Sequence, residues 1–509
     1  MKEKILFWID IEFVYFFIAK YMSQKYDFDA YAIIDVNEKA KEFFDNQNLI
    51  NFKKKWYFLD HVYISDDTPD LKYLEKSEQK FKINFWNRAY SEKSFYLYNE
   101  YYNFNYNEIL SILEKETRFY EQILDEVKPD FVIIKKTDWH HNQLFYEICR
   151  AKGIRILMMI PTRLGFRVII SQRADKLDNT IIETQIPLKN KEELEETLKN
   201  YNSFEQVNKF RKNFQVYNSN KFFDTLRFFS NPFDNSYQKR YSNWKRTKSK
   251  IIMKNFVSNL KSKSREKFLE RTSIRKINDE SFVYFPLQFE PERTLLVDAP
   301  FYTNQLEVII QIAKSLPIDY KLYVKEHPIM KLKGWRDIQY YKTINDLPNV
   351  KLIHPSVNPK EIYEKCSLVI TGTGTSSFEA TFFSKPSIIF GDVIYSELSN
   401  VTRCKSYEQL PELIKDNLGK KVNLEDLKEF IKKIEHDSFE MDINKLNTDF
   451  SKFCYYGGFL VDEKIPHEKI LKFMESNNDV FDKLSDEHIK KINLFNKNKI
   501  VIDELRKQD

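Results

Sequence analysis

Short apolar runs alternate with amphipathic stretches along the first 180 residues of the chain. The apolar runs predict strands at Ile5–Ile9, Ala30–Asp35 and Asp130–Ile134, and the amphipathic stretches predict helices at Val14–Lys25 and Asn142–Lys152. Strands that alternate with helices in this way are expected to lie parallel in one sheet that is covered on both faces.

The same alternation returns after residue 281. Strands are predicted at Phe282–Pro286, Lys321–Lys325, Val350–Ile353, Leu368–Thr371 and Ser387–Phe390, with helices between them. The connections are short, as in a doubly wound α/β domain. Residues after 420 have a helical pattern instead.

The pattern therefore predicts an α/β protein with two Rossmann-like, doubly wound domains that face each other across a cleft. A chain of 509 residues is too long for a single hydrophobic core. We predict an N-terminal domain at residues 1–190, a basic helical connector at 191–280, a second domain at 281–420 and a helical segment at 421–509 that packs back on the first domain.

Charge is nearly balanced, with 81 Lys and Arg residues against 75 Asp and Glu residues. A nucleic-acid-binding protein is expected to have a larger excess, so no nucleic-acid partner is predicted. The exception is the segment Lys239–Lys276, which contains fourteen basic residues and only two acids, Glu266 and Glu270. This segment is either a solvated connector or a docking face for anionic lipid headgroups or a charged glycan.

No run of about 18 apolar residues is present, so no membrane span is predicted. The first residues, MKEKILFWIDIEF, have acids at Asp10 and Glu12 within the apolar run and indicate a strand rather than a signal peptide. The four cysteines are widely spaced, which favours a reducing compartment. We expect a cytoplasmic protein, with peripheral contact to the inner face of the membrane as an alternative.

The segment VITGTGTSSFEATFFSKPSIIFG, residues Val369–Gly391, carries the strongest chemical signal. A strand leads into a turn rich in Gly, Thr and Ser, and a helix begins just after it. At the carboxyl end of a parallel strand, such a turn can bind a phosphate. The candidate phosphate ligands are Gly372, Thr373, Gly374, Thr375, Ser376 and Ser377, and Glu379 is a candidate acceptor for ribose hydroxyls. The alternative is an ordinary capped helix, because Ser-Ser-Phe-Glu is a favourable helix start.

A second candidate is KLYVKEHPIMK, residues Lys321–Lys331, in which a strand ends at Lys-Glu-His-Pro. Pro328 ends the strand and directs His327 into the cleft. Lys325 and His327 would contact the phosphate and offset the charge that grows on a leaving group, which makes His327 a catalytic candidate as well. A lone histidine also has a structural alternative, but a phosphate turn on a neighbouring strand end favours the site.

Further candidates line the expected cleft. In FPLQFEPERT, Glu290 is a candidate catalytic carboxylate, unless the loop is only a proline-stiffened turn. In the first domain, Asp138 and His141 follow the DFVII strand and are candidate acid/base groups, or simple polar groups of a loop. Arg163 and Arg167 either recognise a carboxylate on an acidic sugar or form salt bridges.

These motifs occur in the same order in one protein family. FPLQFEPE, KEHP, TGTGTSSFEA and KPSIIFGDVIY resemble the bacterial capsule and surface-polysaccharide biosynthesis proteins that include the retaining transferases of 3-deoxy-manno-octulosonic acid (Kdo). The His-Pro and Ser-Ser pairs are also similar to those of bacterial sialyltransferases, which use CMP-activated donors. The resemblance implies a GT-B glycosyltransferase fold in which His327, Ser376 and Ser377 hold the nucleotide phosphate and Glu379 faces the ribose.

The expected function is transfer of Kdo or a related acidic sugar from a CMP-linked donor to a surface glycan or glycolipid. No Asp-X-Asp motif lies at the predicted site, so neither a metal nor a cofactor beyond the nucleotide-sugar donor is predicted. One alternative is another nucleotide-sugar enzyme on the same fold, such as an epimerase or a glycerol-phosphate transferase. The other is a non-catalytic component that binds or exports glycans.

Overall fold

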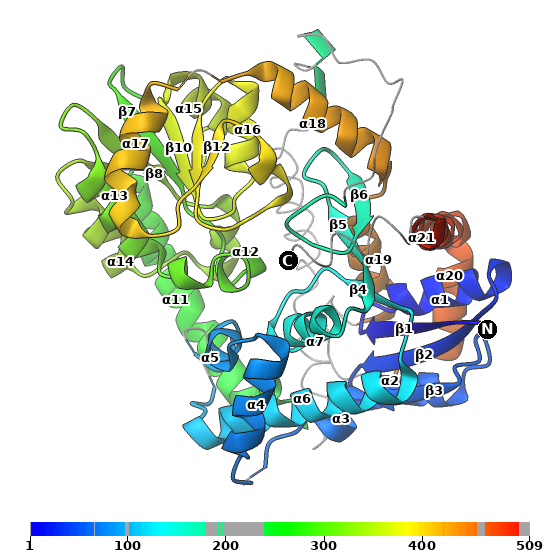
Figure 1. The fold of residues 1–509 in the computed structure, drawn as a ribbon. Helices are drawn as coiled ribbons and strands as arrows, with labels where there is room; N and C mark the ends of the chain where they lie inside the picture. The colour runs from blue at the N-terminus through cyan, green and yellow to red at the C-terminus, as the bar shows by residue number, and fades with distance from the viewer. Residues whose placement is uncertain are drawn as a thin grey trace.

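The computed structural model describes residues 2–65, 67–96, 101–178, 192–193, 196–197, 239–420, 422–455 and 464–497. They form two α/β domains, which helices α11 (Lys248–Thr272) and α18 (Leu424–Asp437) connect (Figure 1). The predicted class, two doubly wound domains with parallel sheets, is confirmed. The predicted domain boundary at residue 190 and the first part of the predicted connector lie outside the described residues.

The N-terminal sheet has the strand order β13-β6-β5-β4-β1-β2-β3. Its strands are β1 Glu3–Asp10, β2 Phe28–Asp35, β3 Lys54–Tyr57, β4 Phe131–Lys135, β5 Arg155–Pro161, β6 Arg167–Ser171 and β13 Ser438–Glu440. The strands β1 to β5 are parallel, whereas β6 is antiparallel to β5 and β13 to β6. The chain order reverses between β1 and β4, and ligands of open parallel sheets bind in the crevice at such a switch point.

Helices cover both faces of this sheet. They are α1 Val14–Lys25, α2 Glu38–Asn46, α3 Phe58–His61, α4 Leu71–Phe81, α5 Phe85–Tyr90, α6 Tyr106–Val127 and α7 His140–Ala151. Helix α1 is buried along most of its length because three C-terminal helices enclose it, namely α19 Ile443–Cys454, α20 His467–Ser476 and α21 Asn478–Lys497. The ring centroids of Phe17 and Phe481 are 4.6 Å apart in this contact.

The C-terminal sheet has the strand order β12-β11-β10-β7-β8-β9, and all its pairs are parallel. Its strands are β7 Phe282–Pro286, β8 Lys321–Lys325, β9 Val350–Ile353, β10 Leu368–Thr371, β11 Ser387–Ile389 and β12 Val401–Arg403. Its helices are α12 Arg293–Leu296, α13 Gln305–Ser315, α14 Ile338–Asn345, α15 Pro359–Lys365, α16 Ser376–Phe382 and α17 Leu410–Leu418. Here the switch point lies between β7 and β10.

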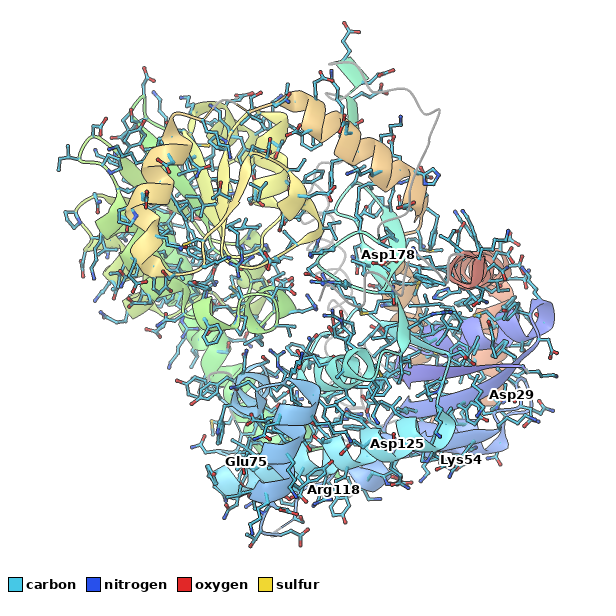
Figure 2. All side chains as sticks on the ribbon, in the orientation of Figure 1. Asp29, Lys54, Glu75, Arg118, Asp125 and Asp178 are labelled. Carbon is cyan, nitrogen blue, oxygen red and sulfur yellow. The ribbon has the colours of Figure 1, made fainter. Side chains whose placement is uncertain are left out.

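The chain returns to the N-terminal domain after α18. Strand β13 joins the edge of the N-terminal sheet, with Phe439 opposite Val168 of β6. Asp178, labelled in Figure 2, pairs with Lys491 of α21 at 2.8 Å. The beginning and the end of the described chain therefore share one hydrophobic core.

Helix α11 carries most of the described basic connector and contacts both domains. Lys250 donates to the backbone oxygen of Tyr101 in the N-terminal domain at 3.1 Å, and Glu266 pairs with Lys331 in the C-terminal domain at 2.8 Å. Leu269 is buried, whereas Phe256 is 61% and Leu260 is 62% exposed. No helix among the described residues is long and apolar enough to cross a membrane.

Candidate active site

The turn between β10 and α16 is packed tightly from within. A Cβ atom added at Gly372 would lie 2.5 Å from the side-chain amide of Gln288, and one added at Gly374 would lie 2.7 Å from Oγ1 of Thr371. Both distances are shorter than real Cβ contacts, so these two positions require glycine for packing. Packing within the domain therefore explains both glycines of the turn.

Gln288 connects the ends of β7 and β10 across the switch point. In the amide orientation that satisfies its partners, its side-chain oxygen accepts from the backbone N–H groups of Thr373 at 3.3 Å and Gly374 at 2.9 Å. These two N–H groups are therefore engaged within the protein, because the side chain that follows β7 fills the space beneath the turn.

The hydroxyl groups of the turn divide into two sets. Thr373 donates to the backbone oxygen of Thr294 at 2.9 Å and Ser377 to that of Gly374 at 3.2 Å, and both side chains are buried. Thr375 and Ser376, like Gly374, are partly exposed. The outward part of the predicted phosphate turn is therefore Gly374–Ser376, and Thr373 and Ser377 support it from behind.

At the end of β8, Glu326 faces the interior. Its carboxylate accepts from Nε of Arg336 at 2.9 Å and from the hydroxyl of Tyr341 at 2.7 Å. Its neighbour Lys325 ends β8, and His327 precedes the short 3-10 helix Pro328–Lys333. Nδ1 of His327 accepts from the backbone N–H of Ile329 at 3.3 Å, which leaves Nε2 as the protonated nitrogen. Burial and the charge of Lys325 lower the pKa of His327 to about 4, so its ring is neutral near pH 7.

Lys325 at the end of β8 and Glu379 of α16 interact electrostatically. Burial lowers the pKa of Lys325 to about 7, and the negative charge of Glu379 opposes that shift. Glu379 is itself buried and accepts from the hydroxyl of Tyr363 at 2.8 Å. The expectation that β8 and β10 are neighbours was wrong, since β7 lies between them.

Glu290, a predicted catalytic residue, has a supporting position. Its carboxylate pairs with Arg336 at 2.7 Å and accepts from Nε2 of Gln305. Arg336 also donates to the backbone oxygen of Gln288 at 2.6 Å. Glu290 thus helps to neutralise a buried guanidinium behind the site.

On the N-terminal side, an ion-pair chain spans the switch point between β1 and β4. Lys135 pairs with Asp10 at 2.9 Å and with Asp138 at 2.9 Å. Burial and the charge of Asp10 raise the pKa of the nearby Glu12 to about 7. Asp138 is therefore part of a charged group at the predicted cleft, as its place after a strand had suggested.

His141 is not part of that group. Its Nε2 lies 3.5 Å from Asp35 and its Nδ1 3.4 Å from the hydroxyl of Tyr241. The structure therefore separates Asp138 from His141, which had been expected to act together. Helix α7 begins at His140, so the side chains of adjacent residues around it point in different directions.

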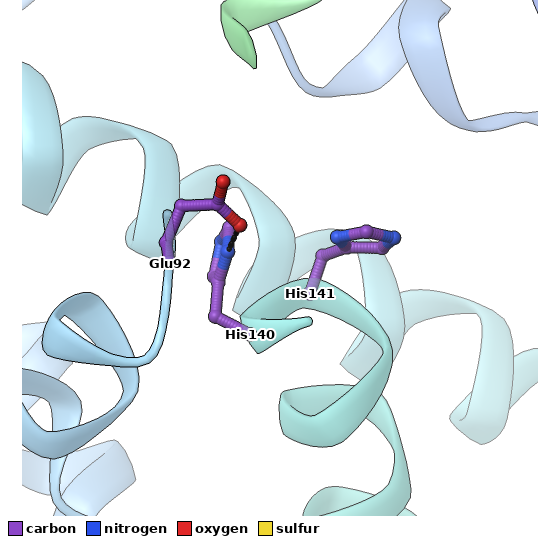
Figure 3. A group of neighbouring side chains, drawn as sticks. All are labelled: Glu92, His140 and His141. Atoms are coloured by element: carbon purple, nitrogen blue, oxygen red, sulfur yellow. Dashed lines mark hydrogen bonds and ion pairs between the residues drawn. The ribbon is translucent and has the colours of Figure 1, made fainter. Parts of the chain in front are cut away.

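His140 is buried between two carboxylates. Its Nδ1 lies 2.8 Å from Glu92 and its Nε2 2.9 Å from Glu116, and Figure 3 shows Glu92 against the ring. Although burial lowers it, the carboxylates of Glu116 and Glu92 raise the pKa of His140 to about 9. Ligand atoms of Glu92, His140 and His141 lie within 4.8 Å of one another. Both ring nitrogens of His140 already have carboxylate partners, so this group is a hydrogen-bonded ion pair.

The two domains contact each other beside these strand ends. Arg293 donates to the backbone oxygen of Thr137 in the N-terminal domain and pairs with Asp298 of its own domain. A second contact between the domains is apolar: Leu164 of the β5–β6 hairpin lies in one buried cluster with Phe378 of α16. These contacts hold the carboxyl ends of the two sheets next to each other.

Of the two roles expected for Arg167, its contacts support the structural one. It donates to Oγ of Ser438 at 2.8 Å and to the backbone oxygen of Glu435 at 3.0 Å, and so fastens β6 to β13. The pattern had not singled out Lys135 or Arg336. The sequence could have indicated Lys135, because it is a charged residue at the end of a buried strand. Arg336 lies in a turn that no sequence pattern distinguishes.

Residues 194–409 match the family model described as capsule polysaccharide biosynthesis protein. The predicted family resemblance is confirmed. The matched segment contains all six strands of the C-terminal sheet, with the end of β8 and the turn of β10. No curated protein matches the chain.

Several solved structures are distantly similar to this chain. A UDP-GlcNAc 2-epimerase from Methanocaldococcus jannaschii is 13% identical with a TM-score of 0.24, and the match covers 86% of this chain and 100% of that one. The β Kdo 2,7 transferase of Thermosulfurimonas dismutans KpsC is 12% identical with a TM-score of 0.28, and the match covers 62% and 79%. The β Kdo 2,4 transferase of the same KpsC is 11% identical with a TM-score of 0.27, covering 59% and 79%. Similarity at this level assigns no activity to this chain.

Proposed function

We propose that this protein is a glycosyltransferase of capsule or surface-glycan synthesis that uses a nucleotide-activated sugar. The observation that carries the proposal is the outward turn Gly374–Ser376 beside Lys325, within the segment that matches the capsule family. The finer proposal is a CMP-linked donor that carries Kdo or a related acidic sugar, and it rests on the motif resemblance.

The chemistry would proceed by stabilising the leaving nucleotide. The hydroxyls of Thr375 and Ser376 would bind the donor phosphate, and Lys325 would supply positive charge to it. His327, neutral near pH 7, would donate a hydrogen bond from Nε2 to the phosphate oxygen on which charge develops. The acceptor would enter from the N-terminal side, where Asp10, Lys135 and Asp138 line the strand ends.

A donor assay tests the proposal. Full-length protein is expected to release CMP from CMP-Kdo, but no nucleotide from UDP-N-acetylglucosamine or CDP-glycerol, and to do so equally with EDTA. His327→Ala is expected to lower turnover about 100-fold, the typical effect of losing one donor to a developing charge. His436→Ala is the matched control, because His436 is exposed on α18. Turnover of His327→Ala within about twofold of the wild type would contradict the assignment.

The same assay separates the alternatives. Conversion of UDP-N-acetylglucosamine to an epimer, or nucleotide release from CDP-glycerol, would favour another enzyme on this fold. A thermal-shift screen with CMP, CDP and UDP identifies a non-catalytic component, which would bind none of the three nucleotides.

We also propose that α11 touches an anionic membrane surface. Its exposed apolar side chains, Met253, Phe256 and Leu260, accompany exposed lysines on the same helix. Each lysine near such a surface contributes about 1 kcal/mol. The triple variant Lys261→Gln, Lys263→Gln, Lys267→Gln is therefore expected to lose co-sedimentation with vesicles of phosphatidylglycerol and phosphatidylcholine. Equal sedimentation of the triple variant and the wild type would contradict the proposal.

A further inference from the structure

Two cations of the N-terminal domain reach the contact between the domains without a carboxylate partner. They are Lys136, which follows β4, and Arg163, which lies in the hairpin between β5 and β6. Among the residues that the structure describes, neither has a carboxylate oxygen within 4.0 Å, whereas Lys135 pairs with two carboxylates and Arg167 with one.

The position of Lys136 is fixed by its neighbour in the chain. The backbone oxygen of Thr137 accepts from Arg293 of the C-terminal domain, so residue 136 lies next to the interdomain contact. Burial and the positive charges of Arg293 and Arg163 lower the pKa of Lys136 to about 7. The negative charges of Asp298 and Asp138 oppose this shift.

Arg163 is held on the other side of the same contact. The hairpin is closed by the hydroxyl of Thr162, which accepts from the backbone N–H of Leu164 at 3.2 Å. Leu164 is 4% exposed and shares a buried cluster with Tyr395. The hydroxyl of Tyr395 donates to the backbone oxygen of Gly374 at 2.8 Å, and the charge of Arg163 acts on that hydroxyl. The hairpin therefore places Arg163 near the proposed phosphate turn.

The acids nearby are already engaged. Asp298 pairs with Arg293, and Asp138 pairs with Lys135 at 2.9 Å. Glu292 accepts from the hydroxyl of Thr294 at 3.1 Å, and burial raises its pKa although the charges of Arg163 and Lys136 oppose that shift. No described carboxylate forms an ion pair with Lys136 or Arg163, so both side chains can pair with an anion of the substrate.

We infer that Lys136 and Arg163 form an anion subsite, which binds carboxylate or phosphate oxygens that the substrate carries beyond the phosphate at Gly374–Ser376. An anion there would compensate two partly desolvated cations, and the guanidinium of Arg163 suits either group. This inference rests on the proposed function, because it requires a nucleotide-linked substrate in the cleft.

Calorimetric titration of the full-length protein with three probes tests the subsite. CMP carries one phosphate, CDP adds a second phosphate, and CMP-N-acetylneuraminate adds a carboxylate. In Lys136→Met and in Arg163→Gln, the affinity for CDP or for CMP-N-acetylneuraminate is expected to fall at least about tenfold, as for a lost charge-assisted hydrogen bond. The affinity for CMP is expected to stay unchanged, and the affected probe identifies the source of the anion.

Two controls accompany the titration. Lys72→Met removes an exposed lysine of α4 and is expected to bind all probes as the wild type does. Lys136→Arg keeps the charge and is expected to retain the affinity that Lys136→Met loses, which separates charge from folding. Unchanged affinities for CDP and CMP-N-acetylneuraminate in both test variants, with normal CMP binding, overturn the subsite alone. Failure of the wild type to bind CMP overturns the proposed function and the subsite together.

Discussion

Each domain buries a cation between two carboxylates near its strand ends, but the two cations differ. In the C-terminal domain, Arg336 lies between Glu326 and Glu290 at 2.9 and 2.7 Å. In the N-terminal domain, His140 lies between Glu92 and Glu116 at 2.8 and 2.9 Å. A guanidinium stays charged at every physiological pH, whereas an imidazole can lose its proton.

The difference teaches how the two sides of the predicted cleft are supported. Arg336 fixes the loop that carries Gln288 and the end of β8 independently of pH. His140 fastens the start of α7 to both Glu116 of α6 and Glu92 while it is protonated, whereas a neutral ring can donate to only one of the two carboxylates. The C-terminal domain thus has a permanent support, and the N-terminal domain has one that titrates.

The largest effect is expected from removing the permanent cation. Arg336→Met should lower the free energy of unfolding of the C-terminal domain by about 3–5 kcal/mol, because two buried carboxylates lose their partner. The loss should be similar from about pH 7 to pH 9.5. Urea denaturation followed by hydrogen exchange, resolved by peptide, measures it for each domain. Lys342→Met on the exposed face of α14 is the control, and a loss below about 1 kcal/mol in Arg336→Met would break the comparison.

The next effect depends on pH. The folded pKa of His140, about 9, lies above its ordinary value of 6.5, so between these values the folded state holds a proton that the unfolded state has released. Its stabilising contribution is complete below pH 6.5 and is lost as the pH rises through 9. His140→Gln should therefore destabilise the N-terminal domain by roughly 3 kcal/mol at pH 6, and much less at pH 9.5.

Denaturation of the wild type and His140→Gln at both pH values measures this difference. His436→Gln is the control, because that histidine is exposed on α18. A destabilisation that is equal at both pH values would mean that His140 acts by packing and not by charge.

A smaller effect is expected from the hydroxyls beside each cation. Tyr341 donates to Glu326 at 2.7 Å, whereas the hydroxyl of Tyr241 lies 3.4 Å from Nδ1 of His141. Tyr341→Phe should cost about 1.5–3 kcal/mol, the range for hydrogen bonds to charged groups, and Tyr241→Phe less than about 1 kcal/mol. The same denaturation measurement applies, and the reverse order of the two costs would contradict the comparison.

The smallest effect sets the baseline for the series. Lys54, labelled in Figure 2, pairs with Glu126 at 2.6 Å on the exposed surface of the N-terminal domain. Lys54→Met should change the free energy of unfolding by less than about 0.5 kcal/mol, because water and salt screen an exposed pair. A cost comparable to that of Arg336→Met would show that burial does not explain the difference.

Local patterns predicted most of the fold. The helix at Val14–Lys25 has the same bounds in the structure, and β7, β8 and β10 begin and end where the apolar runs do. These elements are readable because apolar periodicity and the stop signals around it are properties of neighbouring residues. The turn at Gly372–Ser377 was readable for the same reason.

The contacts within the site were less predictable. No pattern indicates that Gln288 bonds to the turn of β10, since 83 residues separate Gln288 from Thr371 and strand order alone brings them together. The separation of Asp138 from His141 also had no signal, because it depends on where α7 begins and on Glu92, Glu116 and Asp35 from other elements.

By itself, the sequence determined the two α/β domains, the segment that matches the capsule family and the position of the turn between β10 and α16. Only the tertiary structure decided which polar groups face outward, which are neutralised from behind, and that neither Lys136 nor Arg163 pairs with a described carboxylate. The physical reason is that burial and charge pairing depend on distances between elements, and those distances follow from strand order and domain contact rather than from neighbouring residues.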